Sequence, residues 1–143
     1  MTRAQRVSQA AGFTLLELMA TMAIIGIVSS VTAVNVVREI PRYRLTNAAS
    51  QLAWTFRGLR MQAISHHHDV TITFINDHVY TIDSGTVKTV DINVAYPGVR
   101  LGSTANPTFN LTGTVTNLPT ITLTNSTGSK TLTMNILGDV TIQ

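Results

Sequence analysis

Three consecutive histidines and an aspartate, His66-His67-His68-Asp69, have the side-chain types that bind metal ions. Consecutive residues on a strand point to alternate faces, so the three imidazoles would not converge on one ion. His78 would approach the run only across a hairpin. The chain has no cysteine, no His-x-x-x-His spacing and no carboxylate cluster beside the run. We therefore predict a solvated turn between a helix and a strand, with no bound metal and no cofactor.

Glu17 is a second candidate functional residue, because it is a lone carboxylate at the start of a long uncharged stretch. Residues 18–37 carry no charge, and as a helix they would span roughly 30 Å, the thickness of the hydrocarbon core of a bilayer. A carboxylate at such a position is costly without a partner, although the helix dipole favours a negative charge near the N-terminus. The residues alone leave two interpretations of Glu17 open. Its carboxylate is either a charge at the membrane interface, or a charge that is neutralised by a positively charged partner.

Small residues precede this apolar stretch instead of following it, which reverses the order found in a secretory signal peptide. They are Ala10, Ala11 and Gly12. Cleavage after them would leave the apolar helix on the mature protein, and Arg3 and Arg6 would hold the leader in the cytoplasm. The sequence thus predicts a cleaved leader at residues 1–12, a transmembrane helix at 13–37, to which the resemblance described below adds a role in assembly, and a separate domain at 38–143.

The basic residues are concentrated in the middle of the chain. Residues 38–60 contain five arginines and one glutamate, whereas three basic and five acidic residues follow from residue 64 onward. Arg57 and Arg60 are the best placed for a weak DNA contact, but no aromatic residues interleave with the arginines as a stacking platform would require. The chain also lacks a recognisable catalytic triad, phosphate loop or carboxylate pair, so we do not expect an enzyme.

Periodicity predicts the elements that would position these residues. Beyond Pro41, which would kink or interrupt a helix, apolar residues recur at spacings of three and four and define one face of an amphipathic helix: Leu45, Ala48, Ala49, Leu52, Phe56, Leu59 and Ala63. Trp54 and Met61 would widen this face. From residue 70 the period changes to two, which predicts strands at 70–74, 79–82, 87–92, 108–111, 120–124, 131–136 and 140–142. The predicted fold class is α+β, with a long N-terminal helix, membrane-spanning and then amphipathic, packed on an antiparallel sheet.

The segment Gly12-Phe13-Thr14-Leu15-Leu16-Glu17-Leu18 closely resembles the type IV prepilin signature, GFTLxEL. The resemblance implies cleavage between Gly12 and Phe13 by a prepilin peptidase of the inner membrane, and N-methylation of Phe13. It also implies that Glu17 pairs with the amino terminus of a neighbouring subunit during filament assembly. The expected location is the inner membrane, with a single pass and the C-terminal domain in the periplasm, or an extracellular pilus after incorporation. Many major pilins carry a proline in the membrane helix, and residues 32–36 here contain none.

The C-terminal part is similar to the GspH/FimT type of minor pilin in its threonine-rich strands at 109–113, 120–124, 132–136 and 138–142. This resemblance implies a structural minor pilin or pseudopilin of a type IV pilus or type II secretion filament, acting in filament initiation or at the tip, with other pilins as partners. The alternative is a FimT-like minor pilin that captures DNA. Such proteins carry a Gly-Arg-x-Arg pattern near the C-terminus, whereas the matching segment here is Gly138-Asp139-Val140-Thr141. Because each phosphate contact depends on a cation, we expect DNA binding to be weak or absent.

Overall fold

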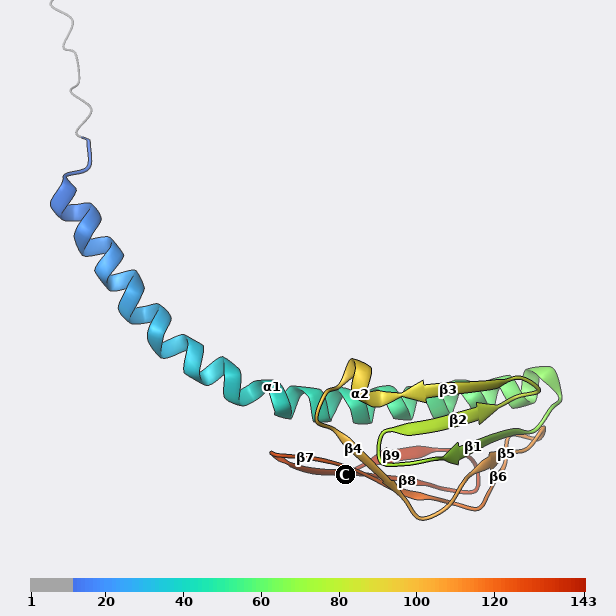
Figure 1. The fold of residues 1–143 in the computed structure, drawn as a ribbon. Helices are drawn as coiled ribbons and strands as arrows, with labels where there is room; N and C mark the ends of the chain where they lie inside the picture. Colours follow the sequence, from blue (N-terminus) through green and yellow to red (C-terminus); the bar gives the residue numbers. More distant parts are fainter. Residues whose placement is uncertain (1–11) are drawn as a thin grey trace, which may run out of the picture. The chain divides into compact units, whose positions relative to one another are not determined.

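The structure is a computed structural model that describes residues 12–143, without the side chains of residues 31–36 and 38. The chain divides into two compact units, Met1–Val37 and Arg38–Gln143. The long helix α1 (Leu15–His66) begins in the first unit, and the second unit adds a short helix, α2 (Ile92–Ala95), and a series of strands (Figure 1). The strands are β1 (Val70–Phe74), β2 (Val79–Asp83), β3 (Val87–Asp91), β4 (Arg100–Ser103), β5 (Thr108–Phe109), β6 (Val115–Thr116), β7 (Thr120–Asn125), β8 (Gly128–Met134) and β9 (Val140–Ile142).

Helix α1 passes through Pro41 without ending, so the predicted interruption at this residue does not occur. Proline removes one helical hydrogen bond, and the packing of the second half of α1 on the domain core offsets that loss. The helix ends at His66. His67 follows with a φ of 52°, and the amide of His68 donates to the carbonyl oxygen of Ala63 over 3.3 Å. This is the left-handed ending that commonly closes a helix. His66 is the last residue of α1, and His67 and His68 lie in an exposed turn, as predicted.

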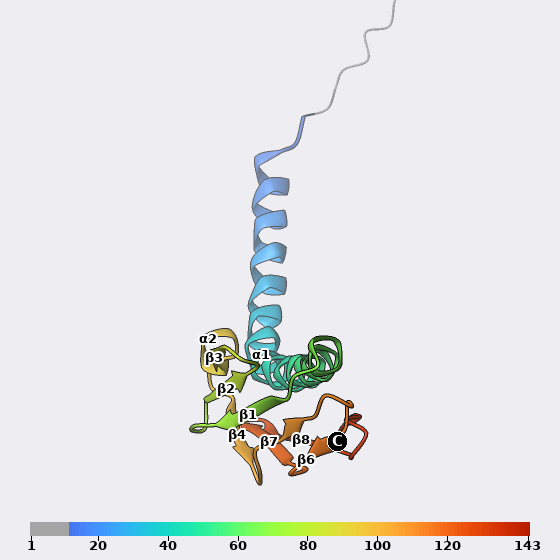
Figure 2. The same cartoon turned by 90° about the vertical axis from the view of Figure 1, so that its right-hand side faces the viewer.

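The strands form two antiparallel sheets, where the sequence had predicted one. The first sheet has the order β3-β2-β1-β5-β6 and the second the order β4-β7-β8-β9. Strands β1 to β3 form the predicted meander, with Ile72 opposite Ile82 and Thr81 opposite Thr89. Within the domain, both sheets lie on one side of the second half of α1 (Figure 2). Strand alternation predicts where strands run, but the choice of partners is a tertiary property.

The core of the domain forms between α1 and the two sheets. All seven residues of the predicted helix face are buried, and Phe56 is fully buried with its ring centroid 6.4 Å from that of Phe109 in β5. The predicted widening of this face is wrong: Trp54 is 68% exposed and Met61 64%. Trp54 follows Leu52 by two residues, which is about 200° around a helix. It therefore points away from the sheets.

Candidate functional site

The first candidate site is the start of α1, which carries the predicted processing and assembly residues. Thr14 caps the helix: its hydroxyl accepts a hydrogen bond from the amide of Glu17 over 3.2 Å, and its carbonyl accepts from the amide of Leu18 over 3.1 Å. Glu17 lies in the first turn, where the partial positive charge of the helix end favours a carboxylate. The Thr14-x-x-Glu17 spacing is that of a capping box. Sequence reasoning missed the role of Thr14, although this spacing signals it.

Gly12 and Phe13 lie outside α1 and are exposed, so the peptide bond between them is accessible in the described residues. A Cβ added to Gly12 would meet no atom of the described residues within 4 Å. The fold of the chain therefore does not require glycine at this position. Residues 1–11 of the predicted leader lie outside the described residues.

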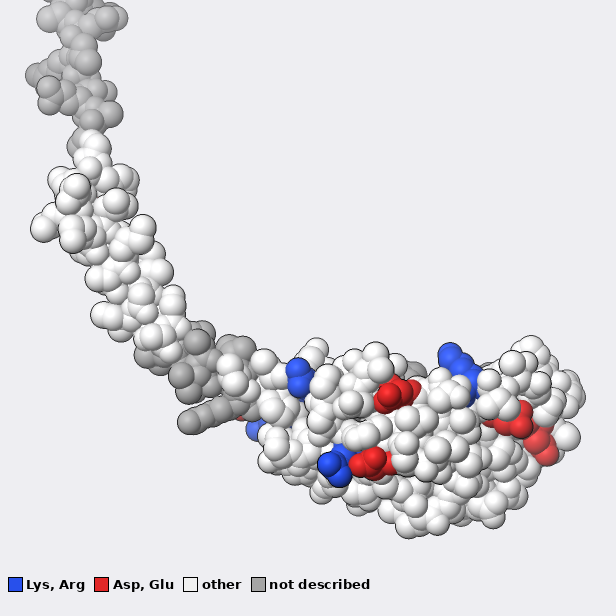
Figure 3. Space-filling view, viewed as in Figure 1, with Lys and Arg blue, Asp and Glu red and all other residues white. Residues whose placement is uncertain are grey.

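The first unit exposes apolar side chains around the described turns of its helix. Phe13 is 86% exposed and Leu16 80%, and large exposed side chains continue along the helix at Leu15, Leu18, Met19, Met22, Ile24, Ile25, Ile27 and Val28. The face shown in Figure 3 carries no charged side chain along the described part of this helix. Two hydroxyl groups bond to the helix itself, since Thr21 donates to the carbonyl oxygen of Leu18 and Ser30 to that of Ile27, each over 2.8 Å. Such bonds reduce the cost of an apolar environment for these polar groups.

Among the described residues, no helix is both long enough and apolar enough to cross a membrane.

Arg57 and Arg60, the residues predicted for a weak DNA contact, reach from α1 to the C-terminal segment at 138–141. Arg57 donates through Nη2 to the carbonyl oxygen of Val140 over 3.2 Å, and its guanidinium carbon lies 5.1 Å from the ring centroid of Trp54. Arg60 donates through Nε to the carbonyl oxygen of Gly113 over 3.0 Å, and its Nη1 lies 3.8 Å from Oδ1 of Asp139. Both guanidinium groups thus already have partners within the domain. The sequence could not show this approach, because the segments are far apart in the chain.

The Arg60 side chain also lies against Gly138, in the loop before β9. Gly138 has a φ of 77°, and a Cβ at this position would lie 2.8 Å from Cδ of Arg60. The positive φ therefore favours glycine there, and a larger residue would also have to displace the Arg60 side chain.

The histidines of the chain lie at two separate places. A Cβ at Gly85, in the turn between β2 and β3, would lie 3.5 Å from Nε2 of His68. His78 instead lies in the turn between β1 and β2, with its Nδ1 3.2 Å from the carbonyl oxygen of Val99 and its Nε2 3.6 Å from Asp77. The register of β1 and β2 puts His68 and His78 at opposite ends of β1, so His78 does not approach the histidine run across the hairpin. In residues 12–143 no group of three or more potential ligands is arranged to hold a metal ion.

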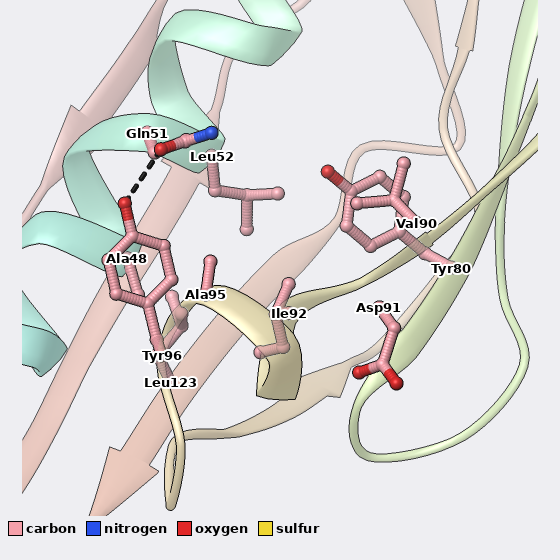
Figure 4. Close-up of a pocket in the computed structure, with 10 residues that line it drawn as sticks. All are labelled: Ala48, Gln51, Leu52, Tyr80, Val90, Asp91, Ile92, Ala95, Tyr96 and Leu123. Atoms are coloured by element: carbon pink, nitrogen blue, oxygen red, sulfur yellow. Dashed lines mark hydrogen bonds between the residues drawn. The ribbon is translucent and has the colours of Figure 1, made fainter.

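A small cavity of about 50 Å³ lies between α1, β3 and α2 (Figure 4). The Tyr96 hydroxyl donates to Oε1 of Gln51 over 2.6 Å at its edge. Burial raises the pKa of the Tyr80 hydroxyl above its ordinary value of 10.0, and a hydrogen bond with Thr55 offsets part of this rise. Ile92 and Leu52 supply apolar walls. The cavity is large enough for only one or two water molecules and offers no site for a substrate.

Known proteins resemble this chain both in a sequence motif and in the fold. Residues 7–33 match the family described as "Prokaryotic N-terminal methylation motif". Two crystal structures of the type IV minor pilin FimU from Pseudomonas aeruginosa PAO1 are similar to this chain at 17% identity. The first has a TM-score of 0.57 and covers 71% of this chain and 90% of that chain. The second has a TM-score of 0.54 with 69% and 92% coverage. No curated protein sequence matches this chain.

Residues 7–33 carry the methylation motif that the signature at residues 12–18 predicted, and together with the fold this motif supports a type IV pilin-like precursor. The α+β fold, a long helix packed on antiparallel sheets, is the pilin fold seen in the minor pilin FimU. At 17% identity this likeness concerns the fold alone.

Proposed function

We propose that this chain is a structural minor pilin or pseudopilin, a subunit of a type IV pilus or type II secretion filament that acts in filament initiation or at the tip. The exposed apolar helix of the first unit is the observation that supports this role most directly. A helix that is apolar on all sides is stable only where lipid or protein covers it. In the proposed role, the inner membrane covers it before assembly and neighbouring pilins cover it in the filament. The chain itself is then a building block and not an enzyme.

We propose that a prepilin peptidase removes the leader between Gly12 and Phe13, and that Phe13 is then N-methylated. Two observations support this site: the methylation motif spans it, and both residues are exposed ahead of the helix. The mature protein would be held by its apolar helix in the inner membrane, with residues 38–143 in the periplasm.

Glu17 is proposed to neutralise the amino group of Phe13 on a neighbouring subunit. Its carboxylate lies at the exposed start of α1 and forms none of the ion pairs among the described residues. In an apolar filament core an unpaired carboxylate would be strongly unfavourable, whereas a paired one is tolerated. In this proposal the neighbouring subunit of the filament supplies the partner of Glu17.

Replacing Glu17 tests this assignment. We expect Glu17→Ala to leave leader removal and the fold unchanged while strongly reducing incorporation into filaments, measured by immunoblotting of sheared pili or pseudopili. Glu39→Ala is the matched control, since Glu39 is an exposed carboxylate of the same helix outside the apolar stretch. Equal incorporation of the two variants would contradict the proposed role of Glu17.

DNA capture is the second candidate function, because Arg57 and Arg60 lie beside residues 138–141, the segment that carries arginines in the DNA-capturing proteins. Two facts oppose strong binding. Both guanidinium groups already have partners, and Asp139 adds a negative charge at the same surface. We therefore propose weak DNA binding or none.

A further inference from the structure

A polar groove of about 380 Å³ lies where the second unit begins, between α1 and the hairpin of β7 and β8. The helix contributes Arg42 and Thr46, and the hairpin contributes Ser129 and Lys130. The other lining residues are Glu39, Leu45, Thr127 and Gly128. None of the functions proposed above uses this groove.

The hairpin is tied to the helix, so the two walls of the groove are held together. Nδ2 of Asn125 donates to the carbonyl oxygen of Pro41 over 2.6 Å. Oδ1 of the same side chain accepts from the amide and the hydroxyl of Thr127 over 2.9 and 2.7 Å. This places the turn directly against the first turns of the domain helix. The groove is therefore a formed feature of the domain, and not a gap between two mobile loops.

The two cations of the groove, Arg42 and Lys130, form no ion pair among the described residues. The ion pairs formed among the described residues involve Arg60, His78 and Arg100, but neither Arg42 nor Lys130. Glu39 is the one carboxylate on the lining, and it is exposed. Two cations that face one groove repel each other, and an anion between them removes that repulsion.

From this arrangement we propose that the groove binds a phosphate-bearing anion. The guanidinium of Arg42 can offer two parallel N–H donors to phosphate oxygens, and Lys130 a compact positive charge. The hydroxyls of Thr46 and Ser129 have no hydrogen-bond partner among the described residues and supply neutral donors. The thioether, thiol and imidazole ligands of soft metals are absent from this lining.

The chain position of the groove favours a phospholipid headgroup as the source of that phosphate. Arg42 follows Val37, the last residue of the apolar stretch, by five residues of the same helix, little more than one helical turn. Headgroups begin where the hydrocarbon core ends. This step rests on the proposed function, since it requires the apolar stretch to lie in a membrane, whereas the anion chemistry of the groove does not.

The test uses the full chain, isotope-labelled, in dodecyl maltoside micelles. Amide resonances of residues 127–130 are followed by NMR while dihexanoyl phosphatidylglycerol, dihexanoyl phosphatidylcholine or inorganic phosphate is added. We expect saturable shifts with the anionic lipid and markedly weaker ones with the zwitterionic lipid. Lys130→Gln should weaken the binding of the anionic lipid about fivefold, as expected for the loss of one partly exposed ionic contact. Lys88→Gln is the matched control, because Lys88 is an exposed strand lysine that does not line the groove.

Saturation by inorganic phosphate at concentrations similar to those of the anionic lipid would establish the anion site and assign it to a soluble ligand. The proposal is overturned if none of the three probes shifts these amides, if the two lipids act equally, or if Lys130→Gln and Lys88→Gln have equal effects. Leader removal and filament incorporation are measured for the same variants in cells. Normal processing and incorporation of a Lys130→Gln variant that has lost anion binding would separate this site from the proposed structural role. Failure of processing in the unsubstituted chain would refute that role and leave the titration interpretable.

Discussion

Replacing Phe56 by alanine tests whether the second half of α1 is the central element of the domain core. The Phe56 side chain is fully buried, and its ring packs at a tilt of 48° on that of Phe109. Removing a buried phenylalanine costs about 3–5 kcal/mol, and an aromatic pair contributes about 0.5–1.5 kcal/mol beyond its buried area. We expect a loss near the upper end of the first range, about 4–5 kcal/mol. That is a large fraction of the 5–15 kcal/mol typical of a folded domain.

The assay is urea unfolding of the fragment 38–143, followed by far-ultraviolet circular dichroism. All the residues of the buried core lie within this fragment, so we expect it to fold. With a slope near 2 kcal/mol per molar urea, the midpoint should fall by about 2 M. Trp54→Ala is the control, because it also removes a large aromatic side chain from α1 but one that is 68% exposed. Its midpoint should change by less than about 0.5 M. Equal shifts for the two variants would refute the assignment of the buried face.

The remaining predictions concern processing, pH and DNA. Gly12→Leu should leave the leader attached without disturbing the fold, since a side chain at Gly12 meets no described atom; intact mass of the membrane-extracted protein measures this, and a normally cleaved variant would contradict the proposed site. Burial raises the pKa of Tyr80 in the folded state above its ordinary value of 10.0. The neutral hydroxyl therefore contributes its full stability below pH 10, and this contribution is lost as the pH rises through the pKa of the folded state. Free energies of unfolding are measured from pH 8 upward, and above pH 10 they should fall less steeply in Tyr80→Phe than in the unsubstituted domain. Parallel curves for the two proteins would show that the Tyr80 hydroxyl does not cause the loss of stability. The domain should not retard duplex DNA at physiological salt, whereas Asp139→Arg combined with Thr141→Arg should produce a mobility shift that weakens as salt rises; tight binding by the unsubstituted domain would favour DNA capture.

Local patterns in the sequence predicted the parts of the fold that local interactions determine. The alternation of apolar and polar residues located β1 and β9 to the residue, and the spacing of apolar residues located the buried face of α1. In β1 and in the second half of α1 the pattern arises because one side of the element is buried, and that side repeats with the period of the backbone.

The elements that were missed have weak local signals. Strand β4 contains one buried residue, Leu101, beside Gly102, so it shows no alternation. Strand β6 has two residues. The predicted third strand was extended to Ile92, but Asp91 accepts a hydrogen bond from the amide of Asn93 over 2.8 Å and starts α2 there. An aspartate that caps a single helical turn is difficult to distinguish from one on an exposed strand face.

The candidate sites likewise divide into those that a local sequence pattern predicts and those that depend on tertiary contacts. The residues at 12–18 are contiguous, so their pattern could be read directly from the sequence. The contacts of Arg57 with Val140 and of Arg60 with Gly113 join segments separated by 83 and 53 residues. The groove of Arg42 and Lys130 likewise combines a helix and a distant hairpin. Their assembly depends on how the sheets pair, which no local pattern specifies.

The exposed position of Trp54 determines what the intrinsic fluorescence of this protein can report. The chain contains a single tryptophan, and its indole lies on the outer side of α1 beneath the guanidinium of Arg57. Since the indole is already largely hydrated in the folded domain, its emission should change little when the core melts. A subunit that covers this side of the helix would instead transfer the indole to a drier environment and shift its emission to shorter wavelengths. The native chain therefore carries an optical reporter of association that is nearly silent to unfolding, and no label needs to be introduced.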